Sequence, residues 1–391
     1  MIARPPRIVL AAGGTGGHMF PALAVAEVLK TRGIEPVLVT DGRGERYSAG
    51  FEGMEKHILP AANVSRGKIS GAVNLMRATL AARKLFADMR PVAAMGLGGY
   101  ATLPALIAAR LRRIPTCIHE QNAVLGRVNR LAAGFIDRIA VSFPDTQRLD
   151  GKYGAKVVVT GNPVRAEVVA LAGSAYETPA AGGRMRLLVL GGSQGATVLS
   201  DVVPPALAGL PEAIRARLAV TQQCRPEDIE AVRAIYAKAG VAAELAPFFS
   251  DVAARLVACD LVIARAGAST ISELEVTGRP SILVPLPGAM DDHQTANAAS
   301  LAGAGGAWLM AQPGFTADAL ARRIEALAEM PEALAAASAA ARGRATLDAA
   351  QRIADMVMAL AGQRLDNRAA QAAARPAGND DTSLSREWRT A

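Results

Sequence analysis

A strand-like run followed directly by a glycine-rich loop and a helical pattern occurs twice in this chain, and this repeated arrangement constrains the fold most. The first copy begins with the apolar run at residues 7–12 and the loop GGTGGH at 13–18. The second begins with the run at 186–190 and the loop GGSQG at 191–195. Short apolar runs and helical patterns keep alternating after each copy, which is typical of βαβ units in a parallel sheet.

The alternation predicts an α/β protein built from two Rossmann-like domains that face one another. Its 391 residues fit two domains of ~100–200 residues each. Predicted strands lie at 7–12, 35–40, 92–96, 116–119, 138–141, 156–160, 186–190, 218–221, 261–264 and 280–284. Predicted helices lie at 21–32, 69–89, 201–210, 226–239, 294–302 and 331–361.

The domain boundaries follow from where this pattern stops and restarts. We place a first domain at residues 1–164 and a second at 165–362, with a loop-like, Gly- and Pro-containing stretch at 174–184. From residue 363 the periodicity is lost and Ala, Arg, Asn, Asp and Ser dominate, so we predict a disordered tail at 363–391.

Composition excludes several classes of function. The three cysteines lie far apart with no CxxC, which excludes a disulfide scaffold and a zinc ribbon. The four histidines have no partner His at helical spacing, so no metal site is expected. The net charge of +8 suits a phosphorylated substrate or an anionic lipid surface, whereas nucleic acid is disfavoured because no zinc-finger spacing or RNP-like run occurs. The N-terminal residues leave no room for the apolar segment of a signal peptide.

Both glycine loops are candidates for phosphate binding. Glycines let backbone N–H groups approach a phosphate, and the following helix N-terminus adds a favourable partial charge. The first loop is not a GxxxxGK[ST] nucleotide-binding loop, because no Lys follows it. Two such loops at the carboxyl ends of parallel strands would face one cleft between the domains. The alternative is that each loop is only a tight strand-to-helix turn.

Three further segments place polar groups after predicted strands. The run HEQN at 119–122 is either a polar site or a solvated turn. Arg165, in GNPVR at 161–165, either recognises a phosphate or is a surface charge. Glu273, in RAGASTISE at 265–273, either accepts both hydroxyls of a ribose or caps its helix.

Six motifs in this order resemble a known enzyme family: GGTGGH, MGLGGY at 95–100, HEQN, GNPVR, GGSQGA at 191–196 and RAGASTISE. Together, over residues 7–360, they are similar to the bacterial N-acetylglucosaminyltransferases that act on UDP-N-acetylglucosamine and lipid I. The resemblance implies the GT-B glycosyltransferase fold, with UDP-GlcNAc bound mainly by the second domain. It also implies inverting transfer of GlcNAc to the MurNAc 4-hydroxyl of lipid I, giving lipid II, with no cofactor, at the cytoplasmic face of the inner membrane.

The resemblance assigns roles to individual residues. Its first-loop contacts are Thr15, Gly16 and Gly17. Its donor-binding positions are Asn122, Arg165, Ser193 and Gln294, with Glu273 as the ribose-binding carboxylate. His18 is its candidate base, with helix capping or orientation of the lipid pyrophosphate as the alternatives.

Two positions depart from the family pattern. His293 stands where the family often has Gln, which predicts a different sugar contact, and Phe249 stands where the family often has Ile. No D-x-D triplet occurs, so the glycine loops and helix N-termini are expected to stabilise the departing UDP. Rival functions are a UDP-GlcNAc 2-epimerase, a diacylglycerol glycosyltransferase, or a two-domain binding protein without catalysis.

The segment at 66–90 is the candidate contact with an anionic membrane surface. It is basic and helical, with a predicted core-facing stripe and apolar residues left over beside it. The alternative is an ordinary buried helix with a solvated basic face. The predicted stripe consists of Ile69, Val73, Met76 and Leu80.

Overall fold

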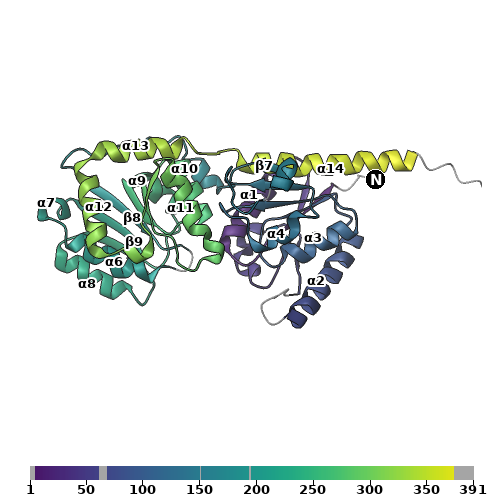
Figure 1. Ribbon diagram of the computed structural model, residues 1–391, viewed down its shortest axis with the longest axis horizontal. Helices are drawn as coiled ribbons and strands as arrows, with labels where there is room; N and C mark the ends of the chain where they lie inside the picture. Colours follow the sequence, from purple (N-terminus) through teal and green to yellow (C-terminus); the bar gives the residue numbers. More distant parts are fainter. Residues whose placement is uncertain (1–4, 61–67, 150, 193–194, 374–391) are drawn as a thin grey trace, which may run out of the picture.

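The computed structural model describes residues 5–60, 68–149, 151–192 and 195–373, and it contains two α/β domains that lie end to end (Figure 1). Each domain is built on one sheet whose strands all run parallel. The first sheet has the order β3-β2-β1-β4-β5-β6-β7 and the second has the order β10-β9-β8-β11-β12-β13. The alternation of strands and helices predicts these two parallel-sheet domains, and the family resemblance implies their GT-B arrangement.

The first domain contains seven strands and, among its described residues, four α-helices before the chain leaves it. The strands are β1 (Arg7–Ala11), β2 (Glu35–Thr40), β3 (Lys56–Ile58), β4 (Ala93–Gly96), β5 (Thr116–Glu120), β6 (Arg138–Val141) and β7 (Val157–Val159). The helices are α1 (Gly16–Thr31), α2 (Lys68–Met89), α3 (Thr102–Leu111) and α4 (Arg127–Ala133), with 3-10 turns η1 (Gly44–Phe51) and η2 (Gly151–Lys156).

The second domain follows the short helix α5 (Ala166–Val169). Its strands are β8 (Met185–Leu190), β9 (Leu218–Gln223), β10 (Ala242–Ala246), β11 (Leu261–Ala264), β12 (Ser281–Leu283) and β13 (Ala307–Leu309). Its helices are α6 (Thr197–Ala208), α7 (Glu212–Arg215), α8 (Ile229–Ala239), α9 (Val252–Ala258), α10 (Ala268–Thr277), α11 (His293–Gly303), α12 (Ala317–Glu329) and α13 (Pro331–Arg342), with 3-10 turns η3 (Met290–Asp292) and η4 (Gln312–Gly314). The chain ends in α14 (Ala349–Ala373).

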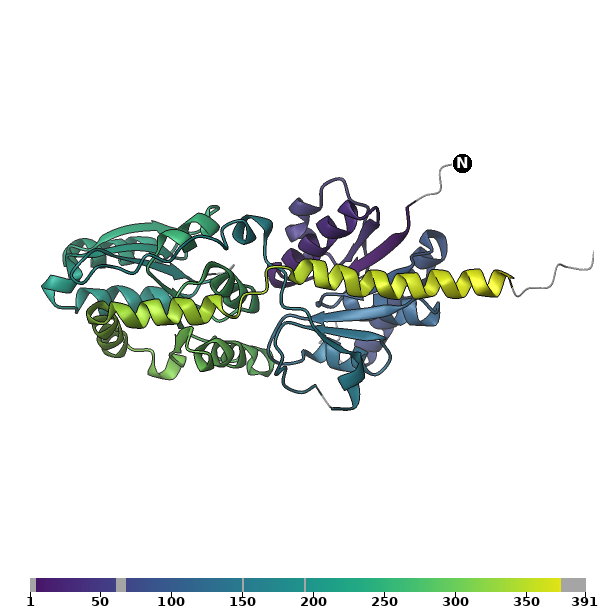
Figure 2. The same ribbon diagram turned by 90° about the horizontal axis from the view of Figure 1, so that it is seen from above.

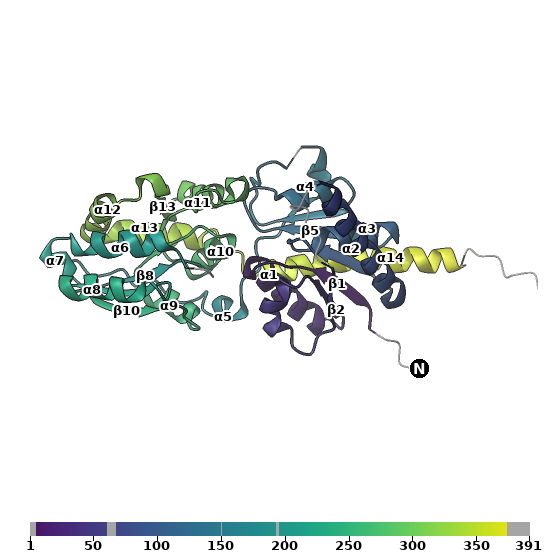
Figure 3. The same cartoon turned by 90° about the horizontal axis from the view of Figure 1, so that it is seen from below.

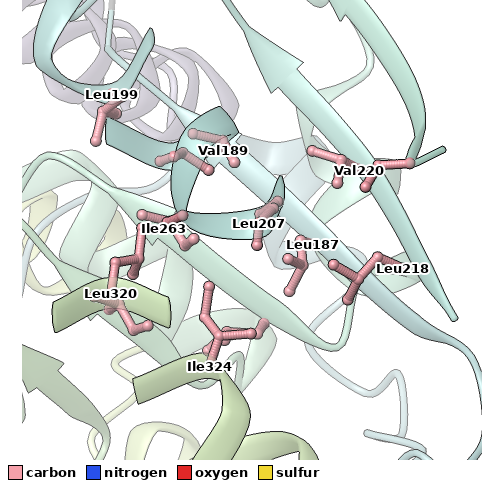
Figure 4. Close-up of a cluster of buried hydrophobic side chains, with 14 of the residues drawn as sticks. Leu187, Val189, Leu199, Leu207, Leu218, Val220, Ile263, Leu320 and Ile324 are labelled. Carbon is pink, nitrogen blue, oxygen red and sulfur yellow. The ribbon is translucent and has the colours of Figure 1, made fainter. Parts of the chain in front are cut away.

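Apolar side chains on the central strands build the cores. In the second domain, Leu187 and Val189 of β8 and Ile263 of β11 pack against Leu207 of α6 and Ile324 of α12 (Figure 4). All five are at most 1% exposed. Parallel strands covered on both faces are apolar along their whole length, which is why these runs were recognisable in the sequence.

All ten predicted strands are present, but three strands were missed. The missed strands β3, β10 and β13 each lie at the edge of a sheet. Their side chains are partly exposed, so their sequences KHI, AAELA and AWL do not form the continuous apolar runs of central strands.

The predicted helix at 331–361 is two helices, and the second returns to the first domain. Ile353 and Val357 of α14 are fully buried in a cluster with Ile8 and Met19. Figure 2 shows α14 lying along the first domain. The proposed second domain at 165–362 therefore ends too late, because the apolar stripe of α14 is covered by α1. The predicted disordered tail is wrong for 363–373, which are helical, while 374–391 lie outside the described residues.

The predicted core-facing stripe of α2 is wrong. Val73, Met76 and Leu80 are 38%, 58% and 56% exposed, and Ile69 lies outside the described side chains. The buried face carries Ala78, Ala82 and Phe86 instead, because small residues let α2 pack closely against α3. Among the described helices, none has the length and apolar character needed to cross a membrane.

Candidate functional site

Two glycine loops of the first domain pack directly on one another at the carboxyl ends of β1 and β4. The Gly13 N–H donates to the Gly98 carbonyl at 3.2 Å. A Cβ on Gly99, whose φ is +84°, would lie 2.3 Å from the Gly13 carbonyl oxygen. Only glycine permits this backbone and this approach, so the two loops form one surface. The exposed Thr15 and Gly17 lie at the start of α1 in this surface, and Gly16 is the buried first residue of α1.

His18 lies in the first turn of α1 and faces the glycine loop that follows β4, at Gly98. Its Nδ1 lies 2.9 Å from the Gly13 carbonyl oxygen. Because a carbonyl only accepts, Nδ1 carries the hydrogen and Nε2 carries the lone pair. Burial lowers the pKa of His18 below its usual 6.5, against the opposing effect of the bond to Gly13. The imidazole is therefore neutral at pH 7, with Nε2 able to accept a proton.

The HEQN run is not a solvated turn, because its first three side chains are at most 3% exposed. His119 Nε2 lies 3.1 Å from the Gly161 carbonyl oxygen, and Gln121 Nε2 donates to the Leu97 carbonyl at 2.7 Å. Each of these bonds reaches a different loop at the edge of the sheet. His119 has a pKa of about 4, lowered mainly by burial.

Glu120 holds the turn that follows. Its Oε1 accepts from the Asn122 backbone N–H at 3.0 Å. Its Oε2 accepts from Gly126 N–H at 2.8 Å and from Asn129 Nδ2 at 2.7 Å. These bonds occupy the carboxylate, so Glu120 fixes the position of Asn122.

Asn122 joins the two domains through a residue that sequence reasoning missed. Asn297 of α11 donates from Nδ2 to Asn122 Oδ1 and to the Ala266 carbonyl, each at 3.1 Å. Its Oδ1 accepts from the Ala123 N–H at 2.8 Å. Asn297 is completely buried. The available signal was its position three residues after Gln294, on the same side of one helix.

Arg165 and Glu273, both predicted to bind the donor, are paired with each other. Arg165 Nε and Nη2 donate to Glu273 Oε1 at 3.2 and 3.0 Å. The Arg165 guanidinium also lies 5.7 Å from the centre of the Phe20 ring in α1. Figure 3 shows α1 and α10 at the junction of the domains. Burial raises the pKa of Glu273, and the positive charge of Arg165 opposes that rise. The helix-cap interpretation of Glu273 finds no support, since α10 has no side-chain cap.

The glycine loop of the second domain is held by a glutamine. Gln223 Oε1 accepts from Gly191 N–H at 3.2 Å, and its Nε2 donates to the Gly192 carbonyl at 3.1 Å. Gly195, at φ +69°, packs against Arg225. Ser193 lies outside the described residues, so its predicted contact with the donor stays a prediction.

Gln294 and His293 begin α11. Gln294 Oε1 accepts from the Leu286 N–H at 3.0 Å, and His293 Nδ1 lies 2.8 Å from the Met290 carbonyl oxygen. Phe249 is 6% exposed beneath Arg255, whereas Phe248 is 72% exposed. The Phe249 side chain is therefore packed inside the domain, and the departure from Ile falls on a buried position. Within the described part of the chain, no group of three or more His, Cys, Asp or Glu residues could hold a metal ion.

Comparison with known proteins gives consistent similarities. Residues 8–141 match the glycosyltransferase family 28 N-terminal domain, and residues 186–353 match the family 28 C-terminal domain. A UDP-N-acetylglucosamine–N-acetylmuramyl-(pentapeptide) pyrophosphoryl-undecaprenol N-acetylglucosamine transferase of Paramagnetospirillum magneticum is 51% identical, covering 92% of this chain and 98% of that protein. The transferase of the same name from Rhodospirillum centenum is 52% identical, covering 91% and 94%.

Solved structures agree with this similarity. The crystal structure of Acinetobacter baumannii MurG has a TM-score of 0.76 at 32% identity, covering 90% of this chain and 99% of that one. A UDP-GlcNAc 2-epimerase from Neisseria meningitidis has a TM-score of 0.62 at 13% identity, which is a likeness of fold alone.

Proposed function

This chain belongs to the family of UDP-N-acetylglucosamine–N-acetylmuramyl-(pentapeptide) pyrophosphoryl-undecaprenol N-acetylglucosamine transferases, and we propose that it transfers GlcNAc from UDP-GlcNAc to the MurNAc 4-hydroxyl of lipid I. The product is lipid II, a precursor of peptidoglycan. The chain is a UDP-GlcNAc-dependent glycosyltransferase with the GT-B fold. We assign it no cofactor and no nucleic-acid partner.

The observation that best supports this proposal is that the predicted donor groups converge where the two domains meet. Arg165 follows the last strand of the first domain, whereas Glu273 lies in α10 of the second, and their side chains are 3.0 Å apart. Both hydrogen bonds from Arg165 go to Oε1 of Glu273, so Oε2 lies outside the pair. In the proposed complex Glu273 Oε2 accepts hydrogen bonds from the ribose hydroxyls, and the Arg165 guanidinium interacts with the negatively charged pyrophosphate.

The proposed reaction inverts the anomeric carbon in a single displacement. The acceptor hydroxyl oxygen attacks that carbon from the face opposite UDP, and the bond from the carbon to the phosphate oxygen breaks. The hydroxyl proton passes to Nε2 of His18, whose lone pair is set by the Nδ1 bond to Gly13. Negative charge then develops on UDP, which Arg165 and the backbone N–H groups at the start of α10 would stabilise.

We further propose peripheral attachment to the anionic cytoplasmic membrane surface through the first domain. The exposed apolar side chains Val73, Met76 and Leu80 occupy one stretch of α2. Near the far end of α2 a hollow of about 410 Å³ is lined by Phe86, Ala87, Arg90, Arg112, Ile114 and Arg364. Apolar and basic groups side by side suit a surface with anionic head groups, where each cation contributes ~1 kcal/mol.

A product assay tests the reaction. The purified chain is incubated with UDP-GlcNAc and lipid I, and products are identified by mass spectrometry. We expect UDP and the glycosylated acceptor in equal amounts, with the stereochemistry at the new bond inverted. Conversion of UDP-GlcNAc to its C2 epimer without glycosylation of the acceptor would replace the proposal with the epimerase function.

Vesicle sedimentation tests the membrane surface. One variant carries Arg77→Gln, Arg83→Gln and Lys84→Gln, and another carries Met76→Ser and Leu80→Ser. Binding to anionic vesicles should fall in both variants, and the charge variant should lose most of its salt dependence.

A matched control removes three exposed cations from the second domain: Lys238→Gln, Arg322→Gln and Arg323→Gln. It should bind vesicles like the wild type. Equal binding by the control and the α2 charge variant, or equal binding to neutral vesicles, would place the membrane contact elsewhere.

A further inference from the structure

One carboxylate of the second domain is surrounded by arginines of the first. Asp291 Oδ1 accepts from Arg148 Nη1 at 2.5 Å, and its Oδ2 accepts from Arg130 Nη2 at 3.1 Å. Arg127 Nε lies 3.7 Å from the same Oδ2. Arg127 and Arg130 belong to α4, and Arg148 belongs to the loop after β6. The Asp291 side chain is only 11% exposed, whereas the Arg127, Arg130 and Arg148 side chains are 66%, 30% and 48% exposed, so this ion-pair cluster crosses the domain interface with its arginines open to water.

The backbone on both sides of this cluster is in an unusual conformation. Five non-glycine residues in the described ranges have positive φ. Arg90 and Arg113 come just after the ends of α2 and α3, where a left-handed residue is ordinary. The remaining three are Arg148 at +60°, Asp291 at +56° and Asp292 at +54°. A non-glycine residue with positive φ outside a helix end is stable only when contacts around it hold that conformation. Here the Arg148–Asp291 hydrogen bond joins two such residues.

The segment carrying Asp291 leads directly into α11, which begins with His293 and Gln294. Asn297, one turn further on, is bonded to Ala123 and Asn122 of the first domain. The start of α11 is thus fixed to the first domain at two points, Asp291 before it and Asn297 after it. Gln294, a predicted donor contact, lies between these points.

We propose that Asp291 is a positioning residue for the transfer reaction, which holds the first turn of α11 and its donor-binding side chain in register with the acceptor loops of the first domain. This inference rests on the proposed function. In that function the residues that bind UDP and the residues that bind the acceptor belong to different domains. The relative position of the two domains therefore decides whether the reacting atoms meet. Asp291 sets this placement through the arginines and touches neither substrate.

The test compares Asp291→Asn with a matched control, Glu275→Gln. Glu275 also lies in the second domain, and its carboxylate is 12% exposed and pairs with Arg344 at 2.9 Å. Both partners of that pair lie in the second domain, so the control loses a similar ion pair without affecting the interface. For each variant we would measure kcat and KM for UDP-GlcNAc, UDP affinity by titration and thermal unfolding.

Asp291→Asn should lower kcat by about tenfold to a hundredfold, the range for one lost charged hydrogen bond, while UDP affinity changes by less than about twofold. Glu275→Gln should leave kcat near the wild-type value. Arg148→Gln should lower kcat in the same way, and the double variant Asp291→Asn/Arg148→Gln should lose little more than either single variant. Wild-type kcat in Asp291→Asn, or losses that multiply in the double variant, would overturn the proposal.

A second measurement does not depend on the acceptor. Spin labels on Leu111→Cys and Glu230→Cys, which are exposed sites in the two domains, report the distance between them. The native cysteines are buried and should resist labelling. Asp291→Asn should broaden the distance distribution and Glu275→Gln should not; unchanged distributions in both would refute the positioning role. A wild-type chain that made no lipid II would refute the proposed function and leave this readout intact.

Discussion

Removing the Glu273 carboxylate should remove the preference for a ribose with both hydroxyls, and it should weaken binding of the phosphates less. In the structure this group is 15% exposed and accepts two hydrogen bonds from Arg165 on one oxygen, Oε1. In the proposed complex the ribose hydroxyls donate to the carboxylate. A hydrogen bond to a charged group contributes about 1.5–3 kcal/mol, so Glu273→Ala should weaken UDP by roughly tenfold to a hundredfold.

The discriminating ligand is 2′-deoxy-UDP, which lacks one of the two hydroxyls. Wild type should bind it about tenfold more weakly than UDP, whereas Glu273→Ala should bind both with nearly equal affinity. Isothermal titration gives the four dissociation constants. Glu275→Ala, on the same helix and at similar burial, is the control and should keep the wild-type preference.

The same substitution leaves Arg165 without its buried partner. Arg165 is 29% exposed and keeps a second contact, to Glu167 at 3.0 Å. The loss of stability should therefore be about 1–2 kcal/mol, below the 3–5 kcal/mol for a fully buried pair, and thermal unfolding would measure it. If Glu273→Ala weakens UDP and 2′-deoxy-UDP by the same factor, the carboxylate acts by orienting Arg165 and our assignment of the ribose contact is wrong.

Two further changes test the first domain. His119 has a folded pKa of about 4 against 6.5 when unfolded, so the unfolded state takes up the proton first and stability is lost as pH falls through that window. Denaturant unfolding should show wild type losing about 2 kcal/mol more than His119→Gln between about pH 7.5 and pH 5; parallel pH profiles would contradict this. Gly99→Ala would place a Cβ 2.3 Å from the Gly13 carbonyl oxygen, so transfer should fall at least about tenfold. UDP affinity, which reports the donor site that we propose in the second domain, should stay at the wild-type value. Unimpaired transfer would show that the contact between the two glycine loops is dispensable.

The sequence was most informative where a residue's environment follows from its immediate neighbours. The central strand β11 was located from end to end, because a strand covered on both faces is apolar along its length. The edge strand β10 has one exposed side and reads AAELA, which does not differ from many helix segments. The glycine loops were recognisable for the same local reason, since positive φ and close backbone approach restrict the residue type.

Helical periodicity identified apolar faces but not the surfaces that cover them. The helical spacing of Val73, Met76 and Leu80 predicts that this face of α2 lies in the core, yet Met76 and Leu80 are exposed and alanines make the contact with α3. On α14 the reverse holds, because Ile353 and Val357 are buried against a domain that ends almost 200 residues earlier. A periodic pattern carries no information on which distant element supplies its partner, so both errors arise from tertiary packing.

The HEQN run shows how far local reasoning reaches into the site. The sequence shows that this run is polar, but it does not show that its side chains bond to three different parts of the molecule. Gln121 bonds to Leu97 in the glycine loop after β4, and His119 lies against Gly161 in the link between the domains. Asn122 bonds to Asn297 of the second domain. Neighbouring residues at one strand end bond to three separate parts of the molecule, so we expect a substitution here to displace the loop at 97–99, the link at Gly161 and α11 relative to one another. If such a variant loses transfer activity, the first explanation is a changed position of the two domains. A direct catalytic role of the substituted residue can be inferred only when the ligand affinity and the distance between the domains are both unchanged.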